Sequence, residues 1–235
     1  MSLHHFSHAD EIWAAHPELA ALALHAGGLA PGRAAPAAQI AALHAQARAR
    51  LAAGPEGEFP EIQAWRRAFS RMGLKPTQYR CAAESLLRRF RKDGDLPALH
   101  PLVDACNAAS LAFAIPIAVF DLAQVTGSLQ VRPATGEEQY LAFDGQAEQP
   151  APGEVVFADS DGHAHARRWC HRQSARSAVG PATARVLIVA EAMHAGAPQD
   201  LDRLQQVLAG LLGALGATVA EARHLQPQAH PLPPP

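Results

Sequence analysis

The fold class of this chain can be read from the segment IAVFDLAQVTGSLQVRPATGEEQYLAFDG (117–145). Before it, apolar residues recur every three or four positions, as they do on one face of a helix. Within it they form short runs that are separated by Gly, Pro or Asp, which is typical of antiparallel strands with hairpin-length connections. This change of period predicts helices first and strands afterwards.

Helical spacing before this stretch predicts four helices, over residues 39–53, 60–72, 82–92 and 98–113. The short runs predict strands at residues 117–122, 129–134, 139–143, 154–159 and 165–171. RVLIVAEAM (185–193) is a longer apolar run, so we expect a central strand there and a final helix over 200–215. ELAALALHAGGL (18–29) is compatible with a strand or with a short helix.

These elements predict an α+β protein: a helix-rich N-terminal half, then a mostly antiparallel, β-sandwich-like core with flanking helices. We interpret residues 1–58, which are Ala-rich and broken by Pro and Gly, as an N-terminal extension of the same globule. Residues 59–222 would form the main domain. Residues 223–235, which end in QPQAHPLPPP, would form a disordered Pro-rich tail.

Composition excludes several classes of protein. Of the 235 residues 49% are hydrophobic and 18% charged, which suffices for a core and argues against a disordered chain. We expect neither a membrane span nor a secretory signal, because the apolar runs are short and the N-terminus lacks a basic start. Three widely spaced cysteines fit neither a disulfide framework nor a CxxC pair, so a reducing cytoplasm is expected. Without zinc spacing, a P-loop or a dinucleotide motif, we expect no metal and no cofactor.

Basic residues are concentrated in two places. Residues 66–92 hold nine of the twenty basic residues, among them Arg66, Arg67, Arg88 and Arg89, and Glu84 is the single acid in that range. Such a face favours phosphate contacts. In the second place, residues 167–176, the side chains of Arg168 and Arg172 alternate with Trp169 and His171, a combination that suits a stacked base. The alternative for both is a solvated polar surface.

Two polar residues fall in apolar surroundings. Asn107 lies on or beside the apolar stripe of its helix, and Glu191 ends the run VLIVA on the strand face that also carries Leu187 and Val189. A buried amide or carboxylate needs partners, because leaving it unpaired costs about 1–3 kcal/mol or more. Both residues are therefore candidates for a ligand site. The alternatives are a core Asn that holds a loop and a Glu at a rim that pairs with an Arg.

The order of these motifs resembles a known family. LVDACNAASL (102–111), IPIAVFDL (115–122), GSLQVRPATGEEQYLAFDG (127–145), VVFAD (155–159) and the strand ending in Glu191 resemble the B3/B4 domain. In bacterial phenylalanyl-tRNA synthetase that domain lies in the β subunit and edits mischarged tRNA. IQAWRRAFSRMGLKP (62–76), ESLLRRF (84–90) and RRWCHRQS (167–174) are similar to the signature of its free-standing members. The resemblance covers about residues 60–220.

The resemblance implies a cleft for the aminoacylated 3′ end of a tRNA, in which a positioned water hydrolyses the ester. It implies that Asn107 and Glu191 are the catalytic-site residues: Asn107 lines the site, and Glu191 recognises the amino acid. Arg168, Trp169, His171, Arg172 and the 66–92 face would then hold tRNA. The implied function is the hydrolysis of a mischarged aminoacyl-tRNA in trans.

The sequence departs from the synthetase pattern at the site. Ala118 stands eleven residues after Asn107, where the synthetase domain has a His, and His171 and Arg172 stand roughly where it has small residues. These changes argue against a pocket shaped for tyrosine. Two other functions stay open: a non-catalytic RNA-binding module, and an amino-acid or small-molecule binding protein that uses the same cleft. The editing hypothesis predicts that Asn107 and Glu191 face one apolar hollow, with Arg172 at its mouth.

Overall fold

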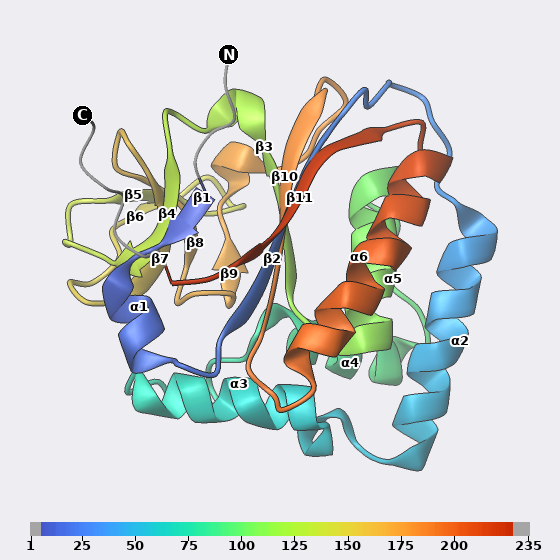
Figure 1. The fold of residues 1–235 in the computed structure, drawn as a ribbon, viewed down its shortest axis with the longest axis horizontal. Helices are drawn as coiled ribbons and strands as arrows, with labels where there is room; N and C mark the ends of the chain where they lie inside the picture. Colours follow the sequence, from blue (N-terminus) through green and yellow to red (C-terminus); the bar gives the residue numbers. More distant parts are fainter. Residues whose placement is uncertain (1–5, 228–235) are drawn as a thin grey trace.

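A four-stranded sheet runs through the middle of the protein (Figure 1). The computed structural model describes residues 6–227. In it the order of the strands is β11 (Thr218–Leu225), β2 (Ala20–Gly27), β10 (Arg185–Ala192) and β3 (Ile117–Asp121). All neighbours in this sheet are antiparallel. The apolar run 185–193 therefore forms an inner strand, as predicted.

A second sheet of seven strands stacks against the first. Its strands are, in order, β1 (Phe6–His8), β4 (Leu129–Pro133), β7 (Val155–Asp159), β8 (His163–Arg167), β5 (Gln139–Leu141) and β6 (Ala147–Glu148), and β9 (Arg172–Gln173) pairs with β8. The pairs β1–β4 and β5–β8 are parallel, and the others are antiparallel. The prediction of an α+β protein with a mostly antiparallel, sandwich-like core is confirmed.

Alternation along each strand builds the core. Phe120 and Val189 of the four-stranded sheet and Val131 and Phe157 of the seven-stranded sheet belong to one buried cluster between the sheets. Because successive side chains point to opposite faces, Ile188 lies on the outer face of the four-stranded sheet, in a separate cluster with the helices. The inner strand β10 is therefore buried on both faces, whereas the edge strand β11 has no buried residue.

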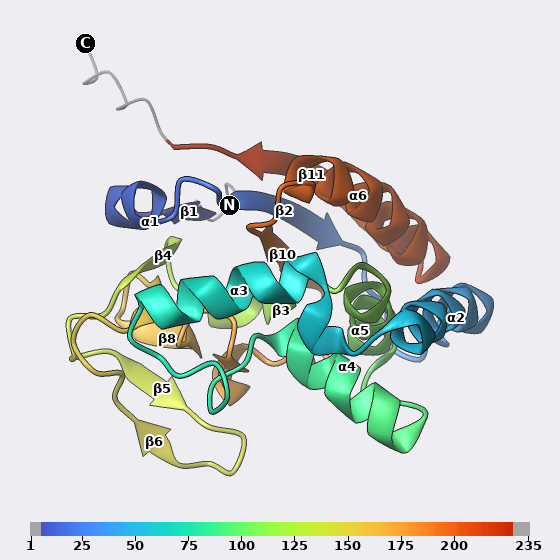
Figure 2. The same cartoon turned by 90° about the horizontal axis from the view of Figure 1, so that it is seen from below.

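Helices cover the outer face and one end of the sandwich (Figures 1 and 2). Helices α5 (Pro101–Phe113) and α6 (Ala197–Ala214) cover the outer face of the four-stranded sheet, and α2 (Ala37–Ala53) packs beside α5. Helix α3 (Pro60–Arg71) lies along one end of the sandwich, next to α4 (Ala82–Asp93). As predicted, Pro60 is at the first helical position of α3. Short 3₁₀ helices cover Glu56–Glu58, Leu122–Gln124 and Ala175–Ser177. No helix within residues 6–227 is long and apolar enough to cross a bilayer.

The structure differs from the sequence predictions at both ends of the chain. Strand β1, the short helix α1 (Asp10–Ala15) and strand β11 were not predicted, because each is short or weakly patterned. The stretch 18–29 forms strand β2, so the N-terminal segment supplies an inner strand of the four-stranded sheet. Strand β11 includes residues 223–225, so the expected tail does not begin at residue 223. The rest of that tail, from residue 228, lies outside the described residues.

One connection of the seven-stranded sheet depends on a buried carboxylate. Glu138 accepts hydrogen bonds from the backbone N–H groups of Thr135 and Gly136, both at 3.0 Å, and from the side chains of Thr135 and Arg132. Burial raises the pKa of Glu138, but these donors outweigh it and lower the pKa to about 2. The charged form therefore stabilises the link between β4 and β5.

We expect Glu138→Gln to lower the free energy of unfolding by about 2 kcal/mol at pH 7, because hydrogen bonds to a charged group are lost. The folded-state pKa lies below the unfolded one, so this contribution is present above about pH 4.5 and disappears as the pH falls towards 2. Urea unfolding at pH 7 and pH 2.5 measures both effects. Glu137→Gln, at an exposed neighbour, is the control. Equal stabilities of the two variants at pH 7 would contradict this role.

Candidate functional site

The turn between β8 and β9 places a tryptophan inside the protein. The strand that we predicted over residues 165–171 ends at Arg167, because Arg168 and Trp169 adopt φ values of +46° and +57°. This left-handed conformation is unusual for a bulky side chain and is a strained one. The Trp169 N–H donates to the carbonyl oxygen of Val155 at 2.7 Å, and the indole ring is fully buried. Trp169 is thus not available to stack on a base, which corrects its expected role in RNA binding.

Glu191 is the acceptor of that buried indole. Trp169 Nε1 lies 3.0 Å from each oxygen of the Glu191 carboxylate, and His8 Nε2 lies 2.6 Å from Oε1. The indole N–H of Trp65 donates to the backbone carbonyl of Glu191 at 3.3 Å. Glu191 is 3% exposed. This residue therefore joins strand β1, strand β10, helix α3 and the β8–β9 turn.

His8 is a site residue that sequence analysis missed. The only local signal is the alternation of Phe6 and His8 in a three-residue strand, which is too short to define a buried face. Its partner is 183 residues away in the chain. Only the parallel pairing of β1 with β4 brings the imidazole to Glu191.

Glu191 borders a small hollow between the two sheets, which we call the Glu191 cavity. Its volume is about 60 Å³, and its apolar wall includes Ala118, Phe157 and Val189. Arg172 is the exposed residue of its lining and has no ion pair with any residue between 6 and 227. A carboxylate thus lies inside this cavity, and an uncompensated guanidinium lies at its edge.

Two further titratable groups line the Glu191 cavity. The first is His171, whose Nδ1 lies 2.8 Å from the backbone carbonyl oxygen of Arg80. Because a carbonyl oxygen only accepts, Nδ1 carries the proton and Nε2 is left as an acceptor. Burial lowers the pKa of His171, and the nearby Arg168 and Arg172 lower it further, so the ring is neutral at pH 7. Burial raises the pKa of Cys170, as do Cys81 and Glu191, so its thiol stays protonated and is a poor nucleophile.

Asn107 lies elsewhere. It lines a groove of about 320 Å³, the Asn107 groove, together with Leu99, Phe143 and Gln173 among others. Asn107 also borders a hollow of about 300 Å³ beside α2. Helix α5 covers the outer face of the four-stranded sheet, whereas Glu191 points inward between the sheets. The expectation that Asn107 and Glu191 face one hollow is therefore wrong.

The two hollows meet at the edge of the sheet. Ile117 and Gln173 line both the Glu191 cavity and the Asn107 groove. Strand β3 is an edge strand, and Gln173 Nε2 donates to the carbonyl oxygen of Val119 on it at 2.7 Å. The two hollows are therefore neighbours on either side of Ile117 and Gln173.

The basic stretch 66–92 is partly neutralised from within. Arg66 donates to both oxygens of buried Glu84, at 3.1 and 2.7 Å, and Arg88 Nη1 lies 3.2 Å from buried Glu56. Arg67 is exposed and has no ion pair among the described residues. Exposed Arg89 lies 3.6 Å from Asp93. Arg66 and Arg88 thus hold buried carboxylates, and Arg67 keeps an unshared charge.

Beside the Glu191 cavity, the guanidinium of Arg168 lies over the Tyr79 ring, 4.8 Å from its centroid. The His171 ring makes an edge contact with the same tyrosine. Arg168 also lies 3.8 Å from Glu154. Tyr79 is the aromatic residue that the structure adds to the expected group of Arg168, His171 and Arg172.

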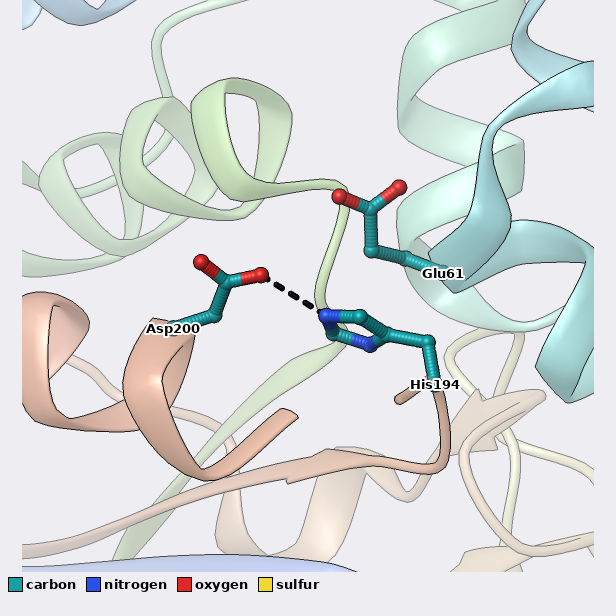
Figure 3. Close-up of side chains that lie close together, drawn as sticks. All are labelled: Glu61, His194 and Asp200. Carbon is teal, nitrogen blue, oxygen red and sulfur yellow. Dashed lines mark hydrogen bonds and ion pairs between the residues drawn. The ribbon is translucent and has the colours of Figure 1, made fainter. Parts of the chain in front are cut away.

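A third group of polar side chains joins helices at the far end of β10. Glu61, His194 and Asp200 could each offer one metal ligand, and these atoms lie within 4.8 Å of one another (Figure 3). His194 Nε2 is 2.7 Å from Asp200 Oδ2, and Arg50 donates to both oxygens of Glu61 at 2.8 Å. Arg203 also pairs with Asp200. Because a guanidinium already neutralises each carboxylate, the group has the charge balance of an ion-pair network.

Comparison with known proteins identifies the family. The B3/4 domain matches residues 64–200, so this chain belongs to the B3/4 domain family, and the resemblance is confirmed. The phenylalanine–tRNA ligase β subunit of Cereibacter sphaeroides is 36% identical over 74 residues, which cover 32% of this chain and 9% of that subunit. The Shewanella oneidensis subunit is 35% identical over 71 residues, 30% of this chain and 9% of that subunit. The matched part is thus a small share of these relatives.

Among solved structures, an N-terminal fragment of the phenylalanyl-tRNA synthetase β subunit from Pyrococcus horikoshii covers 96% of this chain. The sequence identity is 9%, the TM-score is 0.49, and 55% of the fragment is covered.

The hydrogen bonds of Glu191 can be tested through Trp169. Trp169→Phe removes the N–H that both carboxylate oxygens accept, so we expect the free energy of unfolding to fall by about 2–4 kcal/mol. Trp13→Phe is the control, because the Trp13 indole N–H has no partner among the described residues. In urea unfolding, Trp13→Phe should lower the free energy of unfolding clearly less than Trp169→Phe does. An equal loss in both variants would mean that lost apolar area alone explains the effect.

Proposed function

We propose that this protein hydrolyses the ester of a mischarged aminoacyl-tRNA in trans. The observation that supports this most is the Glu191 cavity, in which a buried, oriented carboxylate lies inside an apolar hollow and the exposed Arg172 lies at its edge. Membership of the B3/4 domain family and similarity to phenylalanine–tRNA ligase β subunits also support it.

In this proposal the amino acid enters the Glu191 cavity. His8 and Trp169 hold the Glu191 carboxylate in place, so it can pair with the ammonium group without a cost of reorientation. Ala118 gives no polar group at the position where the synthetase domain has a His. The small volume of the cavity, about 60 Å³, favours a small side chain over an aromatic one.

The reaction requires a water, a proton acceptor and a charge for the oxyanion. The water oxygen attacks the ester carbonyl carbon, the bond from that carbon to the ribose oxygen breaks, and the ribose oxygen takes up a proton. His171 Nε2 is free and unprotonated and would accept the water's proton and return it to the ribose oxygen. Arg172 would stabilise the negative charge on the carbonyl oxygen.

Glu191→Gln tests the role of the carboxylate. The variant keeps the size of the side chain and loses its charge, so we expect deacylation to slow by about tenfold or more while tRNA affinity stays within about twofold. Deacylation of a panel of mischarged tRNAs and a tRNA binding titration measure the two quantities. Glu58→Gln, an exposed site, is the control. Lost tRNA binding in a Glu191→Gln protein with an intact thermal unfolding transition would contradict the assignment.

His171→Gln tests the proton acceptor. Because the pKa of His171 lies below 6.5, the wild-type rate should be level from pH 7 to 8 and fall as the pH drops through that pKa. The rate of the variant should be about 10²–10⁴-fold lower, and it should no longer fall as the pH drops through the pKa of His171. His163→Gln, which lines neither hollow, should leave the profile unchanged. If the rate of His171→Gln falls at acidic pH as the wild-type rate does, His171 is excluded as the base.

A second candidate function is a non-catalytic RNA-binding module. The Glu191 carboxylate already has hydrogen-bond partners in His8 and Trp169, and Ala118 offers no polar group for catalysis. Both observations favour this second function. It predicts salt-dependent tRNA binding without hydrolysis of any mischarged tRNA in the panel.

A further inference from the structure

Strand β11 is an open edge of the four-stranded sheet (Figure 1). It is eight residues long, contains no proline and pairs on one side only, with β2. No backbone group among residues 6–227 pairs with its other side. Such a row of unpaired N–H and C=O groups is able to pair with a strand of another chain.

The helix beside β11 leaves this edge accessible. His224 Nε2 lies 3.1 Å from Asp202 Oδ1, so the face of α6 that carries Asp202 adjoins β11. At helical spacing the same face carries Ala209 and Gly213, which are small and exposed. A Cβ atom at Gly213 would have no neighbour within 4 Å. A second strand can therefore approach β11 without meeting a large side chain at these positions of α6.

The charges of β11 match those of a second copy of the same strand. Glu221 Oε1 lies 3.1 Å from Arg223 Nε, so both side chains stand on one face, with Ala222 between them on the other. In an antiparallel pair with Ala222 opposite Ala222, Glu221 of each copy stands opposite Arg223 of the other. Two cross-strand ion pairs result. A pair centred on Glu221 or on Arg223 would set like charges opposite each other, so charge selects the register.

A β-bulge limits the length of this pairing. The register of β11 against β2 shifts between Val219 and Glu221, which leaves Ala220 as the extra residue. The regular part of the strand is therefore residues 221–225. A short ladder gives a small interface, so we expect a reversible association with a dissociation constant on the order of 10 µM.

We propose that two copies of this protein associate through antiparallel pairing of β11 with β11, which joins their four-stranded sheets into one continuous sheet. The two copies use the same surface, as a two-fold axis requires. Strand β3, which borders the Glu191 cavity and the Asn107 groove, is the opposite edge of the sheet. Both hollows therefore stay open in the dimer, and the association is independent of the proposed hydrolysis.

Sedimentation equilibrium of the full chain tests the pairing. The wild type should form a dimer. Glu221→Arg and Arg223→Glu each set like charges opposite each other at both cross-strand pairs, so each should raise the dissociation constant about tenfold or more. The double variant Glu221→Arg/Arg223→Glu restores opposite charges within and between the copies. Its dissociation constant should return to within about threefold of the wild-type value.

Glu137→Arg is the matched control, because it makes the same change of net charge at an exposed position next to the other sheet. It should leave the dissociation constant unchanged, and thermal unfolding checks that every variant is folded. The proposal is overturned by a wild type that stays monomeric up to about 200 µM. It is also overturned if both folded single variants dimerise as the wild type does, or if the folded double variant dimerises no better than they do.

Discussion

The carboxylate of Glu191 is a charged group in an apolar interior, and several distant parts of the chain are arranged to satisfy it. Such a group is tolerated only when it is paired and hydrogen-bonded, because its desolvation costs several kcal/mol. His8 from the N-terminal strand and Trp169 from a left-handed turn supply the donors. The strained conformation of Trp169 is offset by these contacts. The β8–β9 turn, strand β1 and helix α3 therefore take their positions around one side chain.

The four-stranded sheet acts as a partition. Side chains of β10 alternate between its faces, so Glu191 points between the sheets, while α5 and Asn107 lie on the other side. The partition ends at β3, where Ile117 and Gln173 border both hollows. Asn107 and Glu191 thus line separate hollows, whereas a single cleft was expected.

Charge is distributed in a similar way. Many basic side chains form ion pairs within the protein. These pairs are Glu84–Arg66, Glu56–Arg88, Glu61–Arg50 and Asp200–Arg203. The first three pairs join different helices, whereas Asp200 and Arg203 both lie in α6. A count of basic residues along the sequence therefore overstates the charge that is available to RNA. Arg67 and Arg172 have no ion pair among residues 6–227, so they represent the charge available to a ligand better than the count over the whole stretch does.

Local structure could be predicted from the amino-acid sequence. This holds for the change of period after Pro116, the helix start at Pro60, the inner strand around residues 185–193, and the presence of Asn107 and Glu191 in apolar surroundings. Periodicity reports which face of an element is buried, and this information is local. Tertiary structure alone decided that His8 lies on Glu191, that Trp169 turns inward, that Phe143 stands in solvent, and that Asn107 and Glu191 lie on opposite sides of a sheet. These facts depend on how elements far apart in the chain stack and pair, and no short-range pattern encodes that.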